Sequence, residues 1–186
     1  MKRLNLGCGQ NKKDGYVNID KYPSFAPDVV WDLERCPWPF ENDSVGEAVL
    51  HHCLEHLGAT AEQFLAIMQE LYRVCAGGAV IAIDVPHPRS DAYLGDPTHV
   101  RPVTPQVLAL FSKRHNRECQ LRGWASTPLA TYLDVDFEMV AVEYVLMPFW
   151  AEKRQAGTVT QSELEFAMNS YFNVADAIKI KLTVVK

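Results

Sequence analysis

The first residues that could do chemistry form a short run of histidines with a glutamate, His51-His52-Cys53-Leu54-Glu55-His56. Imidazole exchanges a proton near neutral pH and is the commonest metal ligand among side chains. His52-x-x-Glu55-His56 also matches an inverted zinc-protease motif, which belongs inside a helix. Here a strand-like stretch, 45–51, runs directly into its first histidine. A zinc hydrolase is therefore the less favoured alternative, and we predict no metal site.

A second group of polar side chains lies further along, in the proline-rich segment 86–104. His87, Asp91, Asp96 and His99 could each bind a metal, but their spacing matches no standard ligand pattern. Long irregular segments in compact domains often serve as lids or binding loops. We therefore interpret this segment as a lid or substrate loop.

A glycine turn near the start of the chain predicts a cofactor site. The apolar run before Gly7 reads as a strand, and Gly7 and Gly9 let a ligand approach the backbone where a Cβ would clash. Residues 16–20 read as a second strand that ends in Asp20. Parallel strands place their carboxyl ends on one side of a sheet, so these residues should share a crevice. A carboxylate there can accept two hydrogen bonds from a ribose diol.

The connection between these two strands, 10–15, is too short for the usual crossover helix. We therefore expect the first helix to be missing or reduced to a turn. The same observation counts against a nicotinamide-dependent enzyme, whose fingerprint needs a third glycine that opens a helix and an acid roughly 20 residues further on. Here Lys12 occupies the region of that glycine, and Asp20 comes too early.

Strands and helices then alternate. Thr60 and Gln63 predict a capping box for a helix that should stop at a left-handed turn at Gly77-Gly78. A second helix should run from Thr104 to about Lys113, with the cations near 113–117 at its end, and an amphipathic stretch covers 162–177. Further strands are expected at 28–33, 45–51, 79–85, 137–145 and 178–185. The nearly continuous apolar run 79–85 indicates a strand covered on both faces.

Length and composition favour one soluble domain. The chain has 186 residues, of which 48% are hydrophobic, which suits a single domain over 1–186. A net charge of −5 argues against sequence-independent binding to nucleic acid, and no apolar run could span a membrane. The five cysteines are scattered without a Cys-x-x-Cys pair, and no signal peptide opens the sequence. A cytoplasmic location is expected.

These pieces together resemble the class I S-adenosylmethionine-dependent methyltransferases, in particular a small bacterial group related to the "type 11" domain. The resemblance covers most of the first 105 residues. It is carried, in order, by Leu4-Asn5-Leu6-Gly7-Cys8-Gly9, Gly15-Tyr16-Val17-Asn18-Ile19-Asp20, Asp32-Leu33, His52-Cys53-Leu54-Glu55-His56, Glu70-Leu71-Tyr72-Arg73-Val74 with Gly77-Gly78, and Asp96-Pro97-Thr98-His99-Val100-Arg101 with Thr104.

The resemblance implies an α/β, Rossmann-like fold, with a mostly parallel seven-stranded sheet, its last strand antiparallel, and helices on both faces. It implies S-adenosylmethionine as the cofactor. Its methionine part would face the turn Gly7-Cys8-Gly9, its ribose would meet Asp20, and its adenine would meet Asp32 and Leu33. His51 and His52 would lie beside the reactive sulfonium.

The predicted function is methyl transfer to an unidentified acceptor, a small molecule or a saccharide. Where the acceptor must lose a proton, His52 and His99 are the candidate bases, and either could instead be a structural histidine bonded to a loop carbonyl. Asn5 and Asn11 stand where the family usually has an acid and a third glycine. A non-catalytic cofactor-binding or scaffold protein therefore stays an alternative.

Aromatic residues in the second half could wall the acceptor site, although we expect at least half of them in the core. They are Trp124, Tyr132, Phe149, Trp150, Tyr171 and Phe172.

Overall fold

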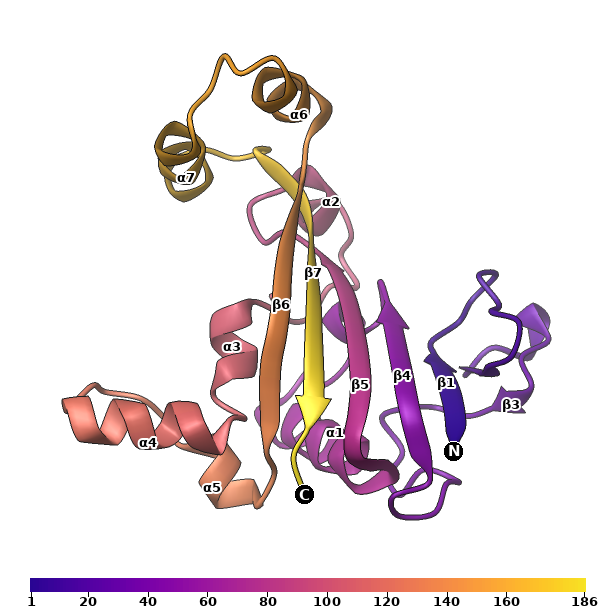
Figure 1. Ribbon diagram of the computed structural model, residues 1–186. Coiled ribbons are helices and arrows are strands. Elements are labelled where there is room, and N and C mark those ends of the chain that lie inside the picture. The colour runs from indigo at the N-terminus through magenta and orange to yellow at the C-terminus, as the bar shows by residue number, and fades with distance from the viewer.

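The computed structural model describes residues 1–186 and contains one seven-stranded sheet (Figure 1). The strands lie in the order β3-β2-β1-β4-β5-β7-β6. Strands β1 to β5 pair in parallel, and β7 is antiparallel to β5 and β6. The predicted fold class is therefore confirmed. The bounds are β1 Lys2–Leu6, β2 Val17–Asp20, β3 Val29–Val30, β4 Val45–His51, β5 Cys75–Pro86, β6 Phe137–Leu146 and β7 Ala175–Val184.

No helix connects β1 to β2, as the short connection predicted. The buried side chain of Asn5 helps to hold this loop. Its Nδ2 donates to the carbonyl of Asn11 and to Oδ1 of Asn18, each at 2.9 Å. A buried amide must find such partners, so Asn5 serves here as a structural donor. Strand β3 is shorter than the predicted 28–33, because its pairing with β2 covers only two residues.

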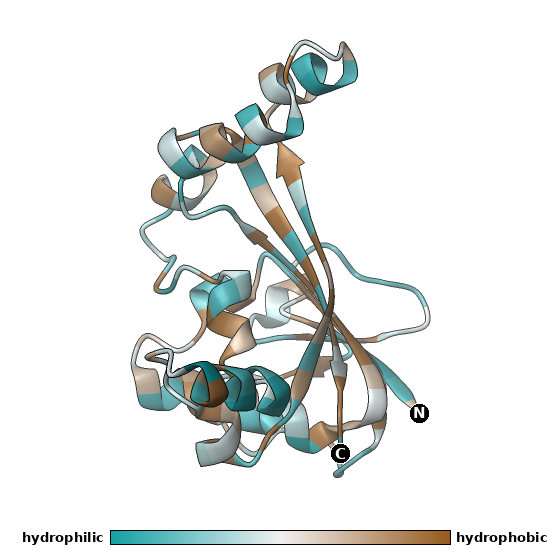
Figure 2. Ribbon diagram, turned by 60° about the vertical axis from the view of Figure 1, so that its left-hand side comes forward, coloured by the Kyte–Doolittle hydropathy of each residue, from teal (hydrophilic) through white to brown (hydrophobic).

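The helices behind the sheet cover only one of its faces, and the expectation of helices on both faces is wrong. They are α1 Ala61–Val74, α3 Pro105–Ala109, α4 Lys113–Arg122 and α5 Leu129–Leu133. Figures 1 and 2 show no helix on the opposite face. In β5, Ile81 and Ile83 are buried while Ala82 and Asp84 are half-exposed. The reason is that both connections before β3 are too short to supply a covering helix.

Helix α1 begins as the capping box predicted. Thr60 Oγ1 accepts from the Gln63 N–H at 3.3 Å, and Gln63 Oε1 accepts from the Thr60 N–H at 3.2 Å. The helix ends at Val74, however, before the predicted left-handed turn. Cys75 is already extended and pairs with Val45, so strand pairing replaces the expected cap. Gly78, with φ of +81°, lies inside β5 where its register with β4 shifts.

Two further helix predictions need correction. Ser112 begins a separate helix α4, since its Oγ accepts from the His115 N–H at 3.1 Å. Lys113 and Arg114 therefore occupy the first turn of α4 instead of the last turn of the preceding helix. The amphipathic stretch 162–177 forms α7 Gln161–Ser170 and then enters β7. Lys179 and Lys181 are exposed on β7, as its alternation predicted.

Three short helices lie beyond the carboxyl ends of β4 and β5 (Figure 1). They are α2 Asp91–Leu94, α6 Pro148–Gln155 and α7. The late aromatic residues are not core, contrary to expectation: Trp150 is half-buried, and Trp124, Tyr132, Phe149, Tyr171 and Phe172 are exposed. No helix has both the length and the apolar character required to cross a membrane.

Candidate functional site

A cavity of about 410 Å³ lies at the carboxyl ends of the parallel strands. It brings together five of the predicted site residues: Gly7, Asp20, Asp32, Leu33 and His52. Asp20 ends β2, and the other four residues closely follow β1, β3 or β4 in the chain. The other lining residues are Lys21, Tyr22, Phe25, Trp31, Cys53, His56, Leu57 and Thr98. The size is within the range of roughly 300–1,000 Å³ that small-molecule sites occupy.

The glycine turn after β1 has the left-handed backbone that glycine favours. Gly7 has φ of +65°, and a Cβ there would lie only 2.4 Å from Sγ of Cys53. Gly9 has φ of +50°, and nothing lies within 4 Å of the place its Cβ would occupy. The Gly7 position thus requires glycine for packing inside the protein, while Gly9 borders open space and does not itself line the cavity. Cys8, between them, is buried and does not line the cavity.

The carboxylate of Asp20 holds the turn against the end of β2. Its Oδ2 accepts from the Gly9 N–H at 2.8 Å, and its Oδ1 accepts from the Tyr22 N–H at 2.9 Å. The residue is only 8% exposed, and it lines the cavity. Each carboxylate oxygen can accept more than one hydrogen bond, so Asp20 keeps acceptor capacity for a ligand diol.

The far wall of the cavity is formed by the loops on either side of β3. Asp32 Oδ1 accepts from the Glu34 N–H at 3.0 Å, which orients its carboxylate, and Leu33 is buried. Tyr22 and Phe25 meet edge to face with ring centroids 6.1 Å apart. Sequence reasoning missed this aromatic pair. The signal was an aromatic at each end of a short loop directly after the acid that ends a strand.

His52 lines the cavity in an unusual backbone conformation, with φ of +47°. Its Nδ1 lies 3.3 Å from Oε1 of Glu55, whose side chain is completely buried. Its close pairing with this carboxylate raises the pKa of His52, against the opposing effect of burial. The segment after it, Leu54–His56, is a single 3₁₀ turn. The helix that the zinc-protease motif requires is therefore not formed.

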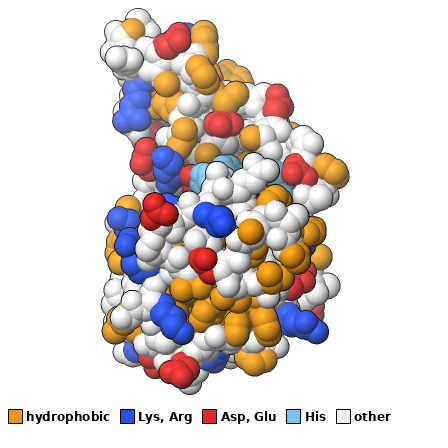
Figure 3. Space-filling model, turned by 90° about the vertical axis from the view of Figure 1, so that its right-hand side faces the viewer, with side chains coloured by type: hydrophobic (Ala, Val, Ile, Leu, Met, Phe, Trp, Pro, Cys, Tyr) orange, Lys and Arg blue, Asp and Glu red, His pale blue; other side chains and the backbone are white.

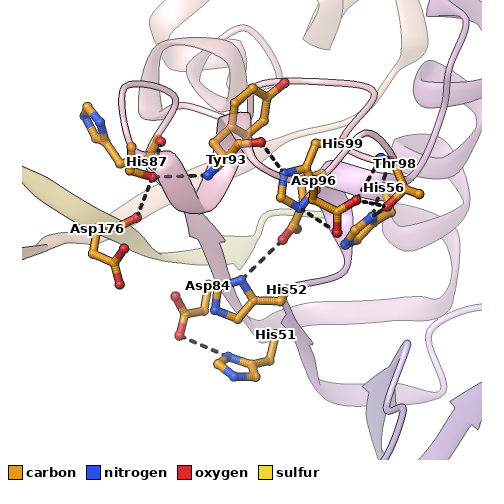
Figure 4. A network of polar contacts seen from close by, with 12 residues as sticks. His51, His52, His56, Asp84, His87, Tyr93, Asp96, Thr98, His99 and Asp176 are labelled. Atoms are coloured by element: carbon orange, nitrogen blue, oxygen red, sulfur yellow. Dashed lines mark hydrogen bonds and ion pairs between the residues drawn. The ribbon is translucent and has the colours of Figure 1, made fainter. Parts of the chain in front are cut away.

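His51 lies on the other side of the strand end. Its Nδ1 is 3.0 Å from Oδ2 of Asp84 on β5 (Figure 4). It lines a second cavity of about 680 Å³ on the uncovered face of the sheet, together with Lys12, Lys179 and other residues. His51 thus does not share a cavity with Asp20, although the His51 and His52 rings are 4.6 Å apart.

His99 is beside the first cavity but does not line it. Its Nδ1 donates to the carbonyl of Tyr93 at 2.7 Å, which is the loop-carbonyl contact of a structural histidine. His56, to which sequence reasoning assigned no role in the cofactor or acceptor site, does line the cavity, with Thr98. Figure 4 shows His56, Thr98 and His99 gathered together. In Figure 3, histidine side chains reach the surface midway along the side of the molecule that carries β3.

The segment 86–104 is held by backbone contacts at both ends. The His87 N–H donates to the carbonyl of Asp176 at 2.8 Å, and the Val100 N–H donates to the carbonyl of Glu55 at 3.0 Å. The guanidinium of Arg101 donates to the carbonyl of Gly58 at 3.0 Å and lies over the Phe64 ring. The carboxyl-terminal end of this segment is therefore fixed beside the first cavity.

No protein-family model and no curated protein matches the sequence. Solved structures are similar in fold. A SAM-dependent methyltransferase from Archaeoglobus fulgidus has 18% identity and a TM-score of 0.64, covering 98% of this chain and 86% of that one. One from Methanosarcina mazei has 15% identity and a TM-score of 0.57, covering 99% and 92%. A geranyl diphosphate methyltransferase in complex with SAM has 13% identity and a TM-score of 0.53, covering 99% and 78%. This chain therefore has the Rossmann-like fold of the class I S-adenosylmethionine-dependent methyltransferases.

Proposed function

We propose that the protein is an S-adenosylmethionine-dependent methyltransferase that binds its cofactor in the 410 Å³ cavity. One observation carries the proposal: Gly7, Asp20, Asp32 and Leu33 lie at or just after the ends of three different strands and line this one cavity. The residues present fit the cofactor. Gly9 leaves open space beside the turn, and Asp20 retains acceptor capacity for a ribose diol.

The adenine end would lie against Leu33, Tyr22 and Phe25, where apolar and aromatic surface is available. The carboxylate of Asp32 would accept from its exocyclic amino group. When bound, the cofactor supplies an electrophilic methyl group, and its transfer requires chiefly alignment and a preorganised environment.

His52 is the residue placed to move a proton. Its Nδ1 faces the Glu55 carboxylate, which leaves Nε2 to accept the proton of an acceptor hydroxyl. A base at this place suits an acceptor that carries a hydroxyl group. We propose that the methyl acceptor is a small molecule or a saccharide. His99, whose Nδ1 is bonded to the Tyr93 carbonyl and which lies behind the cavity wall, is the weaker candidate.

Calorimetric titration with S-adenosylmethionine and S-adenosylhomocysteine tests the cofactor assignment. Asp32→Asn keeps the acceptor for the Glu34 N–H and should weaken binding about tenfold, since one charge-assisted hydrogen bond is lost. Asp20→Ala should weaken it further, with folding checked by circular dichroism. Asp14→Ala, an exposed acid outside the cavity, is the matched control. Absence of binding by the folded wild-type protein would contradict the proposal.

A measurement of methyl transfer distinguishes an active methyltransferase from the alternative, a non-catalytic cofactor-binding protein. A screen of hydroxyl-bearing acceptors should yield S-adenosylhomocysteine in proportion to acceptor consumed, and His52→Gln should reduce the rate without changing cofactor affinity. Cofactor binding with no turnover on any acceptor would support the scaffold alternative instead.

A further inference from the structure

Five of the six histidines of the chain lie close together at the carboxyl ends of β4 and β5, and one group among them includes a carboxylate. The side chains of Glu55, His56 and His99 each offer one ligand atom, and these atoms lie within 4.8 Å of one another. Two nitrogens and one carboxylate oxygen form a donor set that suits zinc and other divalent transition metals.

The carboxylate of Glu55 is the observation that points to a cation. The residue is 0% exposed, and neither side-chain oxygen has a hydrogen bond of acceptable geometry. Nδ1 of His52 lies 3.3 Å from Oε1, and Oε2 has no partner. A buried carboxylate is expensive unless it is paired or coordinates a metal. The protein therefore provides no partner for Oε2, and a bound cation would supply one.

Both imidazoles are held in the tautomer that a metal ligand requires. Nδ1 of His99 donates to the carbonyl of Tyr93 at 2.7 Å. Nδ1 of His56 lies 3.0 Å from Oγ1 of Thr98, and that hydroxyl donates its own hydrogen to Asp96 at 2.6 Å. Thr98 therefore accepts from His56. Each Nε2 then carries a lone pair, with Oδ2 of Asp96 lying 3.8 Å from Nε2 of His99. Hydrogen bonds of this kind at Nδ1 orient ligating histidines in metal sites.

The backbone fixes these residues relative to one another. The carbonyl of Glu55 accepts from the N–H groups of Val100 and Arg101, at 3.0 and 3.3 Å. The loop that carries His99 is thus bound directly to the turn that carries Glu55 and His56. The ring centroids of His56 and His99 lie 4.7 Å apart, and the ring planes are inclined by 57° to each other. Ligand atoms about 2.1 Å from a tetrahedral zinc ion lie roughly 3.4 Å apart. The three ligand atoms, which lie within 4.8 Å of one another, would therefore have to move closer together to bind it.

We propose that Glu55, His56 and His99 bind a divalent transition-metal ion beside the cofactor cavity. The alternative group, His51, His52 and Asp84, is less suited. Nδ1 of His51 already pairs with Asp84 at 3.0 Å, and the His51 side chain is 45% exposed. Because His56 lines the cavity, a bound ion would lie at its edge. There the ion would bind an acceptor oxygen, a step that also rests on the proposed function.

Metal binding is measured without any methyl transfer. Chelator-treated full-length protein, kept reduced, is titrated calorimetrically with zinc chloride, and bound metal is counted by mass spectrometry after dialysis. One equivalent should bind. His56→Ala and His99→Ala should each weaken binding about 100-fold or more, because even the hydrogen-bond partners of ligating histidines are worth 10–100-fold. His115→Ala, on α4 and outside the cluster, should bind as the wild type does.

A second variant and a second measurement separate the possible outcomes. His51→Ala should leave binding unchanged, and loss of binding there with retention in His99→Ala would assign the ion to the other group and overturn the proposal. If the variants misfold, Co²⁺ added to wild-type protein labelled with ¹³C-histidine should shift the ring signals of His56 and His99 but not of His115. No binding by folded wild-type protein would also overturn it. Metal binding without binding of S-adenosylmethionine would contradict only the proposed function.

Discussion

The carboxylate of Asp20 accepts a hydrogen bond from the backbone N–H of Gly9 at 2.8 Å. This contact ties the end of β2 to the turn after β1 and closes one side of the cavity. The two residues are eleven positions apart with no helix between them. The side chain of Asp20 therefore does part of the positioning that a first helix would otherwise do, in addition to its proposed contact with the cofactor.

Replacing Gly7 should destabilise the fold more than replacing Gly9. In Gly7→Ala the new Cβ would meet Sγ of Cys53 at 2.4 Å, which we expect to cost about 1–3 kcal/mol on top of the strain of its positive φ. Gly9→Ala carries only the strain, since nothing lies within 4 Å. Urea unfolding measures both. Cys53→Ala should partly rescue Gly7→Ala, and equal losses in the two glycine variants would refute the steric explanation.

An acid at position 5 should destabilise this protein, although the methyltransferase family that the sequence resembles usually has an acid there. Nδ2 of Asn5 donates to the Asn11 carbonyl and to Oδ1 of Asn18, and a carboxylate cannot donate to either. Asn5→Asp should lower the free energy of unfolding by about 1–3 kcal/mol at pH 7. Asn11→Asp, at an exposed side chain, is the control. A neutral effect of Asn5→Asp in thermal unfolding would show that the buried amide is not needed.

Glu70 should make stability depend on pH on the acid side. Its carboxylate accepts from the Trp38 N–H and from Arg73 Nε, the latter at 2.8 Å. Burial alone would raise the pKa of Glu70, but the hydrogen bonds from Arg73 and Trp38 outweigh it and lower the pKa below its ordinary value. The stabilisation is therefore present above the unfolded pKa and is lost as pH falls through the folded one.

Glu70→Gln tests this relationship because glutamine resembles the protonated acid. It should cost about 2–3 kcal/mol at pH 7, below the roughly 3–5 kcal/mol for breaking a buried ion pair outright. In denaturant titrations, the difference from wild type should shrink steadily as pH falls below the ordinary pKa of a glutamate. Glu152→Gln, at an exposed position on α6, should show no such trend. A pH-independent difference would mean that the charge of Glu70 contributes little.

The start of α1 gives a local prediction. Thr60→Ala removes the acceptor of the Gln63 N–H and should lower stability by about 1 kcal/mol. Gln63→Ala removes the reciprocal contact to the Thr60 N–H and should cost less. The double variant should cost less than the sum of the two, because they share one capping box. Strict additivity in thermal unfolding would argue against a reciprocal cap.

Much of the fold and part of the site are local properties of the sequence. The apolar runs that became β4 and β5, the turn at Gly7, the cap at Thr60 and the missing first helix all follow from neighbouring residues and chain length. Strand ends in a parallel sheet meet on one side, so Asp20, Asp32 and His52 could be placed near Gly7 without coordinates.

Tertiary structure decided the rest, because it depends on contacts between distant segments. Pairing of Cys75 with Val45 ended α1 before Gly78, against its local preference. The direction of each side chain at the end of β4 separated His51 from His52, which no spacing rule predicts. His99 lies 43 positions after His56, and tertiary hydrogen bonds, such as those from the Val100 and Arg101 N–H groups to the Glu55 carbonyl, bring their loops together.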